Sequence, residues 1–405
     1  MPVTTLALSS PDDVLAAVQG ALAEEQPLEI VGHGSKRGIG RAAQAAHTLD
    51  LSGLSGVTLY EPEELVLSAR AGTPLAEIEK LLADYRQELA FEPMDYGSLL
   101  GGKPGRGTIG GALAANLSGP RRIKAGAARD HILGIHAVSG RGEAFKSGGR
   151  VVKNVTGYDL SKAMAGSWGT LAVVTDVTFK VLPAAETETT LVLSGLADDQ
   201  AANVLAHAMG SSAEVSGAAH LPMLVSGSVA GGILGGNAAT LLRVEGVAPS
   251  VAFRVSRLKN LLKAAGEMRE LTGEDSRRLW RDIRDCIPFA SDKDRAKPVW
   301  RVSMAPSDGH RMVDALRREA PVNTFYDWQG GLIWLMMEAD PEAETLRSLI
   351  RRFGGGHATL VRATASQRAL IPVFQPQSAP LAQLSVRLKE QFDPKGILNP
   401  GRMGF

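Results

Sequence analysis

Two glycine-rich stretches carry the residues that could do chemistry in this sequence. The first is VGHGSKRGIG, residues 31–40, and the second is GTIGGALAANLSG, residues 107–119, which has four glycines and no charged side chain. Glycine lets backbone N–H groups approach a phosphate closely because no Cβ stands in the way. Two such loops far apart in the chain favour a long phosphate-bearing ligand that is clamped from two sides.

The alternatives to a two-sided clamp are a single phosphate-binding motif in one of the loops and a purely structural role. Gly32 and Gly34 match the start of a dinucleotide-binding fingerprint, and Asp50 lies near the spacing of its ribose carboxylate. Arg37, however, occupies the place of the third glycine, where close helix packing is needed. No lysine follows the paired glycines of the second stretch, which excludes a Walker A loop. Residues 107–119 could also be a tight crossing of the core without a ligand.

The elements around these loops alternate between strand and helix over the first 182 residues. Apolar spacing of three and four after the cap candidate Ser10 predicts a helix over 12–25, and a second helix is predicted over 74–85. Residues 28–32 and 63–73 are β-rich, and residues 131–145 predict two strands with a turn at 140–142. Residues 169–183 predict a further pair of strands.

The pattern changes after residue 183, where we place a domain boundary. Two rounds of strand and helix follow, which favours a sheet with helices packed on one face. Residues 215–242 contain no charged side chain, but six glycines and Pro222 argue against a membrane span. We expect a buried strand, a mobile glycine loop and a second strand there. Residues 381–405 predict a helix that runs into a loop rich in proline and glycine.

Composition limits the classes of partner and compartment. The 405 residues include 44 Lys and Arg against 43 Asp and Glu, so no global charge favours nucleic acid. The single cysteine, Cys286, excludes an internal disulfide, a cysteine-based zinc site and an iron-sulfur cluster held by this chain alone. The N-terminal residues show no signal-peptide pattern. We expect a cytoplasmic protein.

Five segments together resemble one protein family. They are GHGS, TIGGALAANLSG, RDHILGIHAV, NVTGYDLSKAMAGSWGTLAVVTDV and the C-terminal FDPKGILNPGRM. The sequence resembles the FAD-linked oxidase family of vanillyl-alcohol oxidase and p-cresol methylhydroxylase. The resemblance implies an α+β fold: a two-subdomain FAD-binding domain over 1–183, and an α+β cap domain over 184–380 with an antiparallel sheet and helices on one face. A C-terminal helix and loop over 381–405 would return to the flavin.

The resemblance also implies which residues hold FAD. The first loop would donate backbone N–H groups to one phosphate, the second stretch would cover the pyrophosphate and the path to the flavin ring, and later residues would hold the adenine end or return to the ring. The implied cofactor-binding residues are Gly32, His33, Gly34, Ser35, Lys36, Thr108, Ile109, Gly110, Gly111, Asn116, Ser118, Gly119, Gly166, Gly169, Thr170, Val174 and Asn399. Arg121, Arg122 and Arg129 are further candidates for offsetting phosphate charge.

Two departures from the family pattern bear on how FAD is bound. Trp168 stands where many relatives carry glutamate, so the adenine side is expected to be packed rather than hydrogen-bonded. His33 lies in the loop that carries the covalent attachment in some relatives, yet its neighbours do not match the covalent pattern. The resemblance therefore implies noncovalent FAD, with His33 contributing backbone contacts.

Oxidation of a 2-hydroxy acid needs a base for the hydroxyl and a cation for the carboxylate. The metal site of larger family members has no counterpart in this sequence. His357 and Arg362, in GGGHATLVRA, are the nearest candidates for base and carboxylate anchor, although a structural role is the stronger expectation for a lone strand histidine. We therefore expect no metal, and the catalytic residues stay open.

The stretches SGPRRIKAGAARDHILG and GGGHATLVRA resemble the smaller flavoprotein subunits of bacterial glycolate-oxidising complexes. That resemblance implies oxidation of glycolate to glyoxylate together with a larger FAD-linked subunit and an iron-sulfur subunit. Membrane association would be peripheral, on the inner face and through these partners. The alternatives are a stand-alone FAD-dependent 2-hydroxy-acid oxidase or dehydrogenase, and a non-catalytic scaffold that holds FAD.

Overall fold

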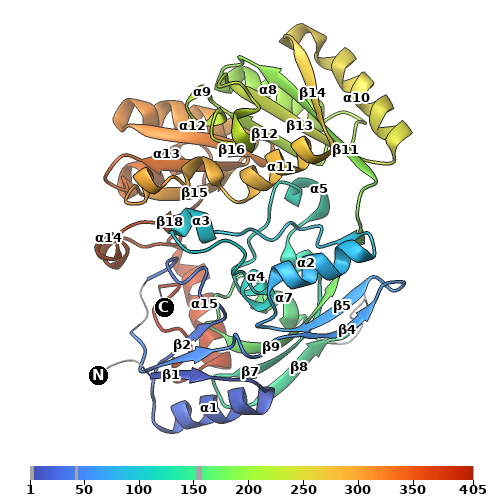
Figure 1. Ribbon diagram of the computed structural model, residues 1–405. Coiled ribbons are helices and arrows are strands. Elements are labelled where there is room, and N and C mark those ends of the chain that lie inside the picture. The colour runs from blue at the N-terminus through green and yellow to red at the C-terminus, as the bar shows by residue number, and fades with distance from the viewer. Residues whose placement is uncertain (1–3, 42–43, 152–156, 405) are drawn as a thin grey trace.

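The computed structural model describes residues 4–41, 44–151 and 157–404. The chain forms two lobes, with the N-terminal lobe below and the cap lobe above in Figure 1. Part of one family-like segment, residues 152–156, lies outside the described residues. The α+β architecture expected from the sequence is confirmed, because each lobe combines β-sheet with helices.

The N-terminal lobe contains two principal sheets. A parallel sheet has the order β1 (Thr4–Ala7), β3 (His47–Asp50), β2 (Leu28–Val31). An antiparallel sheet has the order β4 (Val57–Glu61), β5 (Val66–Arg70), β9 (Ala172–Lys180), β7 (Ile132–Ser139), β8 (Ala144–Gly148). The short strands β6 (Gln87–Glu88) and β10 (Leu182–Pro183) pair separately.

Helices of the N-terminal lobe begin largely where the sequence predicts. Helix α1 (Pro11–Ala23) starts at a capping box in which Ser10 Oγ accepts from the Asp13 N–H at 3.1 Å. Helix α2 (Leu75–Asp84) follows Pro74 and buries an apolar face. The other helices are short: α3 (Gly97–Leu100), α4 (Ile109–Ala115), α5 (Arg122–Ala125), α6 (Ala128–His131) and α7 (Leu160–Met164).

One expected strand pair in this lobe is wrong. The segment over 169–183 forms the single nine-residue strand β9 followed by the two-residue β10, rather than a hairpin. Between residues 172 and 180 there is no glycine, proline or asparagine to make a turn, so the alternating pattern continues along one strand. Strand β9 lies at the centre of the antiparallel sheet and buries every second residue.

The cap lobe is built from two successive rounds of strand, helix, strand, strand, helix, strand. Its eight strands form one sheet in the order β14 (Met268–Thr272), β11 (Thr187–Ser194), β13 (Ala239–Gly246), β12 (Gly217–Leu221), β16 (Val322–Asp327), β17 (Leu332–Met337), β15 (Val299–Met304), β18 (Gly356–Arg362). The two rounds meet where His220 of β12 pairs with Tyr326 of β16. The sheet is antiparallel throughout, as expected.

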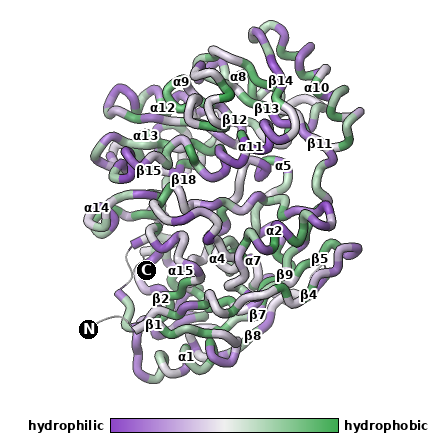
Figure 2. Tube along the Cα trace, in the orientation of Figure 1, coloured by the Kyte–Doolittle hydropathy of each residue, from purple (hydrophilic) through white to green (hydrophobic). Residues whose placement is uncertain are grey.

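Four long helices cover the outer face of the cap sheet: α8 (Asp198–Met209), α10 (Ala248–Leu262), α12 (Pro306–Glu319) and α13 (Ala343–Arg352). Hydrophilic residues are interspersed along α12 and α13, whose apolar residues face the sheet (Figure 2). Helix α11 (Gly273–Arg284) lies on the inner face, between the sheet and the N-terminal lobe, and its Trp280 joins the core that both lobes share.

The uncharged segment over 215–242 contributes strands β12 and β13, as predicted. The glycine-rich part between them holds the short helix α9 (Met223–Ser226) and a helical turn at Ala230–Gly232. Among the described residues, no helix is long and apolar enough to cross a membrane.

The chain returns to the N-terminal lobe after the cap. Helix α14 (Ala365–Leu370) follows β18, and helix α15 (Ala379–Phe392) runs beside the lower sheets (Figure 1). Residues after α15 reach β2, where the Leu28 N–H donates to the Ile397 carbonyl at 2.7 Å and the Asn399 N–H donates to the Leu28 carbonyl at 2.9 Å. The end of the chain therefore contacts the strand that leads into the first glycine loop.

Candidate functional site

A cleft of about 870 Å³ lies in the N-terminal lobe, with one side open to solvent. The first glycine loop forms one wall, helix α4 and the loop before it form another, and the C-terminal loop closes one end. Its lining residues are Ile30, Val31, Gly32, His33, Gly34, Ser35, Lys36, Arg37, Leu51, Ala71, Thr108, Gly110, Gly111, Ala114, Ala115, Met164, Ser167, Trp168, Gly169, Ala172, Val174, Asn399 and Arg402.

The first loop presents hydrogen-bond donors to the cleft. Within the described chain, the backbone N–H groups of residues 33–36 find no acceptor. Gly34 has a φ of +71°, which bends the loop in the left-handed region that favours glycine. A Cβ on Gly32 would come within 2.7 Å of Thr108 Oγ1 across the cleft. The two glycine stretches therefore lie against each other, as the sequence predicted.

Lys36 is the charged side chain of this loop that has no anionic partner. Its ammonium forms no ion pair or hydrogen bond with any described residue, although it lines the cleft. Burial lowers the pKa of Lys36, and the more distant Asp95 and Asp285 oppose this effect. An unpaired cation beside four unsatisfied N–H groups creates a site suited to an anion.

The second glycine stretch has two different roles on its two sides. A Cβ on Gly110 would come within 2.8 Å of the Ala71 carbonyl oxygen, so this glycine permits close packing of α4 on the chain after β5. Gly119 is similar, because its Cβ would lie 2.7 Å from Glu92 Cβ. At Gly111 the Cβ would meet Thr108 Oγ1 alone, at 3.1 Å, and otherwise opens into the cleft. The same segment therefore packs closely against the core on one side and forms a wall of the cleft on the other.

Asn399 joins the C-terminal loop to two walls of the cleft. Its Oδ1 accepts from the Ile30 N–H at 2.9 Å and its Nδ2 donates to the Trp168 carbonyl at 2.8 Å. Gly169 has a φ of +69°, and a Cβ there would lie 2.8 Å from Asn399 Nδ2. Buried Lys389 of α15 adds a second tie, because its ammonium donates to the Thr170 carbonyl at 2.6 Å. The C-terminal loop therefore closes the adjacent end of the cleft.

The structure brings most of the sequence-predicted residues to one cleft. The residues that line it are Gly32, His33, Gly34, Ser35, Lys36, Thr108, Gly110, Gly111, Gly169, Val174 and Asn399. The others do not line it: Ile109, Asn116, Ser118, Gly119, Gly166 and Thr170. Ile109 is buried in the lower core, and the Thr170 hydroxyl is used within the protein, donating to the Ser167 carbonyl at 2.7 Å.

Several lining residues were missed by sequence reasoning. Ala114 and Ala115 lie in the quoted glycine stretch, and their small size was the available signal. Arg402 lies within the quoted C-terminal segment, and its Nη1 donates to the Arg37 carbonyl at 3.2 Å. Met164 carried no signal, because a lone methionine fits a core position equally well.

The candidate catalytic pair is not brought together around the cleft. His357 is exposed on the edge strand β18. Arg362 is buried and its guanidinium donates to the carbonyls of Lys297 at 2.9 Å, Leu99 at 3.1 Å and Phe289 at 2.6 Å. Arg362 thus ties the cap lobe to the N-terminal lobe, and a guanidinium with three carbonyl partners is poorly suited to anchor a substrate. Within the described part of the chain, no cluster of metal-ligating side chains occurs.

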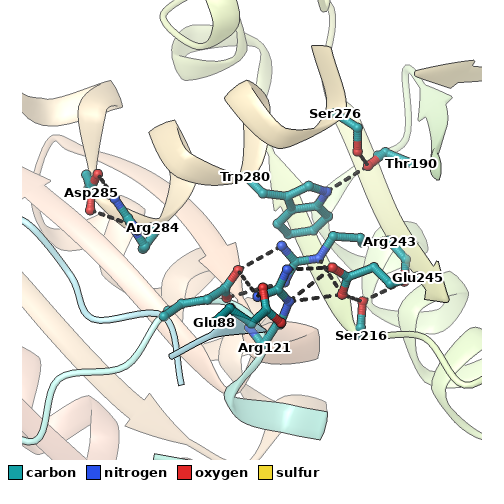
Figure 3. A network of polar contacts seen from close by, with 12 residues as sticks. Glu88, Arg121, Thr190, Ser216, Arg243, Glu245, Ser276, Trp280, Arg284 and Asp285 are labelled. Atoms are coloured by element: carbon teal, nitrogen blue, oxygen red, sulfur yellow. Dashed lines mark hydrogen bonds and ion pairs between the residues drawn. The ribbon is translucent and has the colours of Figure 1, made fainter. Parts of the chain in front are cut away.

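A set of buried charges connects the two lobes beside this site (Figure 3). We call it the inter-lobe ion network, and it comprises Glu88, Glu92, Arg121, Arg243 and Glu245. Arg243 donates to Glu92 at 2.9 Å, while Arg121 pairs with Glu88 at 2.9 Å and with Glu245 at 2.6 Å. Burial alone would raise the pKa of Glu245, but the two arginines lower it to about 2. Arg121 is therefore occupied by carboxylates and does not face a phosphate.

Comparison with known proteins shows which class of protein shares this fold. Residues 2–148 match the family model described as "FAD binding domain". Among solved structures, p-cresol methylhydroxylase aligns with a TM-score of 0.74 at 14% identity, over 99% of this chain and 88% of that chain. Alkyldihydroxyacetonephosphate synthase aligns with a TM-score of 0.67 at 16% identity, over 98% and 76%. The fold is that of FAD-binding enzymes of this type.

A full-length relative defines the family more narrowly. The chain is 36% identical over 392 residues to "Glycolate oxidase subunit GlcE" of Escherichia coli strain K12, covering 96% of both chains. A segment of 85 residues is 41% identical to "Glycolate oxidase subunit GlcD" of Bacillus subtilis strain 168, covering 21% of this chain and 18% of that one. The chain belongs to the GlcE family of FAD-linked oxidoreductase subunits.

The observed cleft fits FAD. The free N–H groups of residues 33–36 and the unpaired ammonium of Lys36 match the needs of a pyrophosphate, which requires hydrogen-bond donors and positive charge. His33 Nδ1 is a further buried polar atom without a partner. The small residues Gly111, Ala114 and Ala115 leave room along the opposite wall. These are features that a closed, ligand-free core would not retain.

Proposed function

We propose that this chain is the FAD-holding subunit of a glycolate oxidase complex, which oxidises glycolate to glyoxylate. The observation that carries the proposal is the cleft with free N–H donors and an unpaired lysine, in a chain that matches a glycolate oxidase subunit along 96% of its length. Oxidation of the CH–OH group removes two electrons and two protons. FAD held in this cleft would supply the acceptor for a hydride from such a carbon.

The residues of this chain bind and orient the cofactor. We propose that the N–H groups of residues 33–36 and the ammonium of Lys36 hold the pyrophosphate, because nothing else in the described chain satisfies them. Gly111 would admit the cofactor along α4, and Asn399 would close the cleft at the C-terminal loop. Val174 and the side chain of Trp168 would pack against the cofactor without donating hydrogen bonds.

We propose the same division of the chain as the sequence suggests. Residues 1–183 would form the cofactor domain, residues 184–380 the cap that faces substrate or partners, and residues 381–405 the returning segment. The binding would be noncovalent. The partners would be a larger FAD-linked subunit and an iron-sulfur subunit that receives the electrons, with peripheral membrane association through them. The single cysteine supports a separate electron acceptor, because a four-cysteine cluster cannot form on this chain.

Two measurements test the proposed function. The purified chain saturated with FAD is expected to be yellow, with an absorbance band at about 450 nm. Denaturation should release the flavin from the protein. A chain that takes up no FAD would overturn the proposal. Glycolate-dependent reduction of an artificial acceptor is then compared for the isolated chain and for the complex purified from native extract. Full turnover without partners would instead indicate a stand-alone oxidase, and a complex whose activity survives loss of FAD from this chain would indicate a scaffold.

A further inference from the structure

The inner face of the cap sheet carries an arginine that no carboxylate neutralises. Arg301 lies in β15, between Trp334 of β17 and Thr359 of β18. Its Nε atom is inaccessible to solvent and has no hydrogen-bond partner, and Arg301 forms no ion pair with any described residue. Burial lowers the pKa of Arg301, although the guanidinium is still positively charged at neutral pH. Arg301 is therefore a half-buried cation whose polar neighbour is the Tyr96 hydroxyl rather than a carboxylate.

A second unpaired arginine lies at the same place. The guanidinium carbons of Arg301 and Arg122 lie 4.8 Å and 4.9 Å from the centre of the Trp328 ring. Arg122 also has no ion pair among the described residues, and burial lowers its pKa. Stacking on an aromatic ring stabilises each cation, while the positive charge of Arg122 further lowers the pKa of Arg301.

The nearest acid does not act as the missing counterion. Asp327 precedes Trp328, and its Oδ1 accepts the Trp328 N–H at 2.7 Å. It forms no ion pair with either arginine within 4.0 Å. Burial raises the pKa of Asp327 to about 7, so a large fraction of this carboxyl is protonated at neutral pH. The arginines of the inter-lobe ion network, in contrast, contact carboxylates directly.

Trp328 places this pair of arginines at the far end of the cofactor wall. Its Nε1 donates to the Gly119 carbonyl at 3.0 Å. Gly119 follows Ala115, which lines the cleft, by four residues, and such a segment spans at most about 14 Å. The Oγ of Ser118, in the same segment, is buried and unpaired. Two cations and an unsatisfied hydroxyl therefore lie near Trp328, at the end of the segment that continues the α4 wall of the cleft.

We propose that Arg301 and Arg122 form the anchor for the carboxylate of a small 2-hydroxy acid, with Trp328 as the surface between them. This deepens the proposed function and rests on it, because it assigns the substrate side of the same site. A guanidinium matches a carboxylate in a two-bond geometry, and the pair would be strong inside a buried site. In this proposal Arg301 and Arg122, rather than Arg362, supply the positive charge that binds the substrate. Arg362 has a structural role in the fold.

The test measures binding rather than turnover, on the full chain loaded with FAD. Isothermal titration calorimetry with glycolate, D-lactate, acetate and glycolamide is performed on the native chain and on Arg301→Met, Arg301→Lys and Arg122→Met. We expect glycolate to bind more tightly than glycolamide. Arg301→Met should weaken glycolate binding at least tenfold and remove the preference over glycolamide, while Arg301→Lys should keep part of it.

Thermal unfolding of the same variants provides an independent readout. Arg301→Met removes a half-buried cation that forms no ion pair with a described residue, so its melting temperature should stay equal or rise, and its FAD content should not change. Arg362→Met is the contrasting variant, because it breaks three carbonyl contacts and should lower the melting temperature. Arg318→Met, an exposed residue far from the site, should change neither property.

The outcomes separate this inference from the proposed function. Unchanged glycolate affinity in Arg301→Met, or no carboxylate binding by the native chain, overturns the arginine anchor even if the native complex oxidises glycolate. Loss of affinity accompanied by a lower melting temperature and lower FAD content would assign Arg301 a structural role and also overturns it. Arg301-dependent binding of acetate without binding of any 2-hydroxy acid would support the anion site and contradict the proposed substrate class.

Discussion

The cofactor cleft and the inter-lobe ion network bury polar groups in opposite ways. In the cleft, the N–H groups of residues 33–36 and the Lys36 ammonium have no partner in the described chain. In the network, Arg243 and Arg121 each contact carboxylates from both lobes. The difference teaches that unpaired buried groups mark ligand positions, whereas paired ones hold the fold. Arg301 is informative because it lies near the inter-lobe ion network but, like Lys36 in the cleft, forms no ion pair with a described residue.

The largest expected effect comes from breaking the network at Arg243. Arg243→Met leaves Glu92 and Glu245 buried with Arg121 alone, so the free energy of unfolding should fall by about 3–5 kcal/mol. FAD affinity of the folded fraction should stay within twofold. Chemical denaturation and FAD titration measure the two quantities. Arg318→Met removes an exposed i,i+4 pair and is the control with no expected change. A variant as stable as the native chain would show that the network does not hold the lobes.

Asp327 gives a pH-dependent test of the same contrast. Its pKa is raised to about 7 from an ordinary 3.8, so the folded state disfavours the ionised form. The resulting cost is absent below about pH 4, grows as pH rises towards 7 and is constant above that. Asp327→Asn should therefore nearly match the native chain at pH 4 and exceed its stability at pH 8 by about 4 kcal/mol. Equal pH dependence of both proteins would contradict the buried, unpaired state of this carboxyl.

Adjacent glycines on α4 separate packing from binding. Gly110→Ala places its methyl group 2.8 Å from the Ala71 carbonyl and should lower the free energy of unfolding by about 1–3 kcal/mol. Gly111→Ala points into the cleft and should leave stability nearly unchanged while it weakens FAD binding. Denaturation curves of the apo proteins and FAD titrations distinguish them. If Gly111→Ala binds FAD as the native chain does, the wall formed by α4 lies away from the cofactor.

The smallest effect is expected at Lys36. Lys36→Met removes a buried cation that lacks a partner, so the apo protein should gain about 1 kcal/mol in its free energy of unfolding. FAD affinity should fall about tenfold, because a charge-assisted contact to phosphate is lost. The opposite signs of the two changes are the signature of a residue kept for its ligand. A loss of apo stability would instead show that Lys36 stabilises the fold, as the arginines of the inter-lobe ion network do.

Local sequence patterns predicted many of the elements and both glycine loops, whereas the two-subdomain FAD-binding fold was implied by the family resemblance. Glycine spacing marked both loops because backbone N–H groups need open approaches, and those signals are local. The capping box at Ser10 and Asp13 fixed the start of α1 in the same way. The pattern could not assign a side to each glycine: Gly110 and Gly111 are equivalent in sequence but face a neighbouring backbone and the cleft, respectively.

Long-range pairing explains what sequence reasoning missed. Glu92 and Arg243 are 151 residues apart, and neither carries a local signal of its partner. Arg362 and Arg301 are both arginines in cap strands, yet one meets three carbonyls and the other meets none. Helix α11 was not among the elements predicted from the sequence. It lies on the inner face, where its Trp280 ring and the Arg243 guanidinium stack at 4.7 Å.

The return of residues 389–402 to the first glycine loop has a consequence for biosynthesis. Gly32 and Thr108 leave the ribosome well before Asn399 and Lys389, which close that end of the cleft. At usual elongation rates, roughly 10–40 s separate synthesis of residue 183 from that of the closing segment. Stable loading of the cofactor should therefore require that residues 389–402 have been synthesised and have folded back onto the first glycine loop.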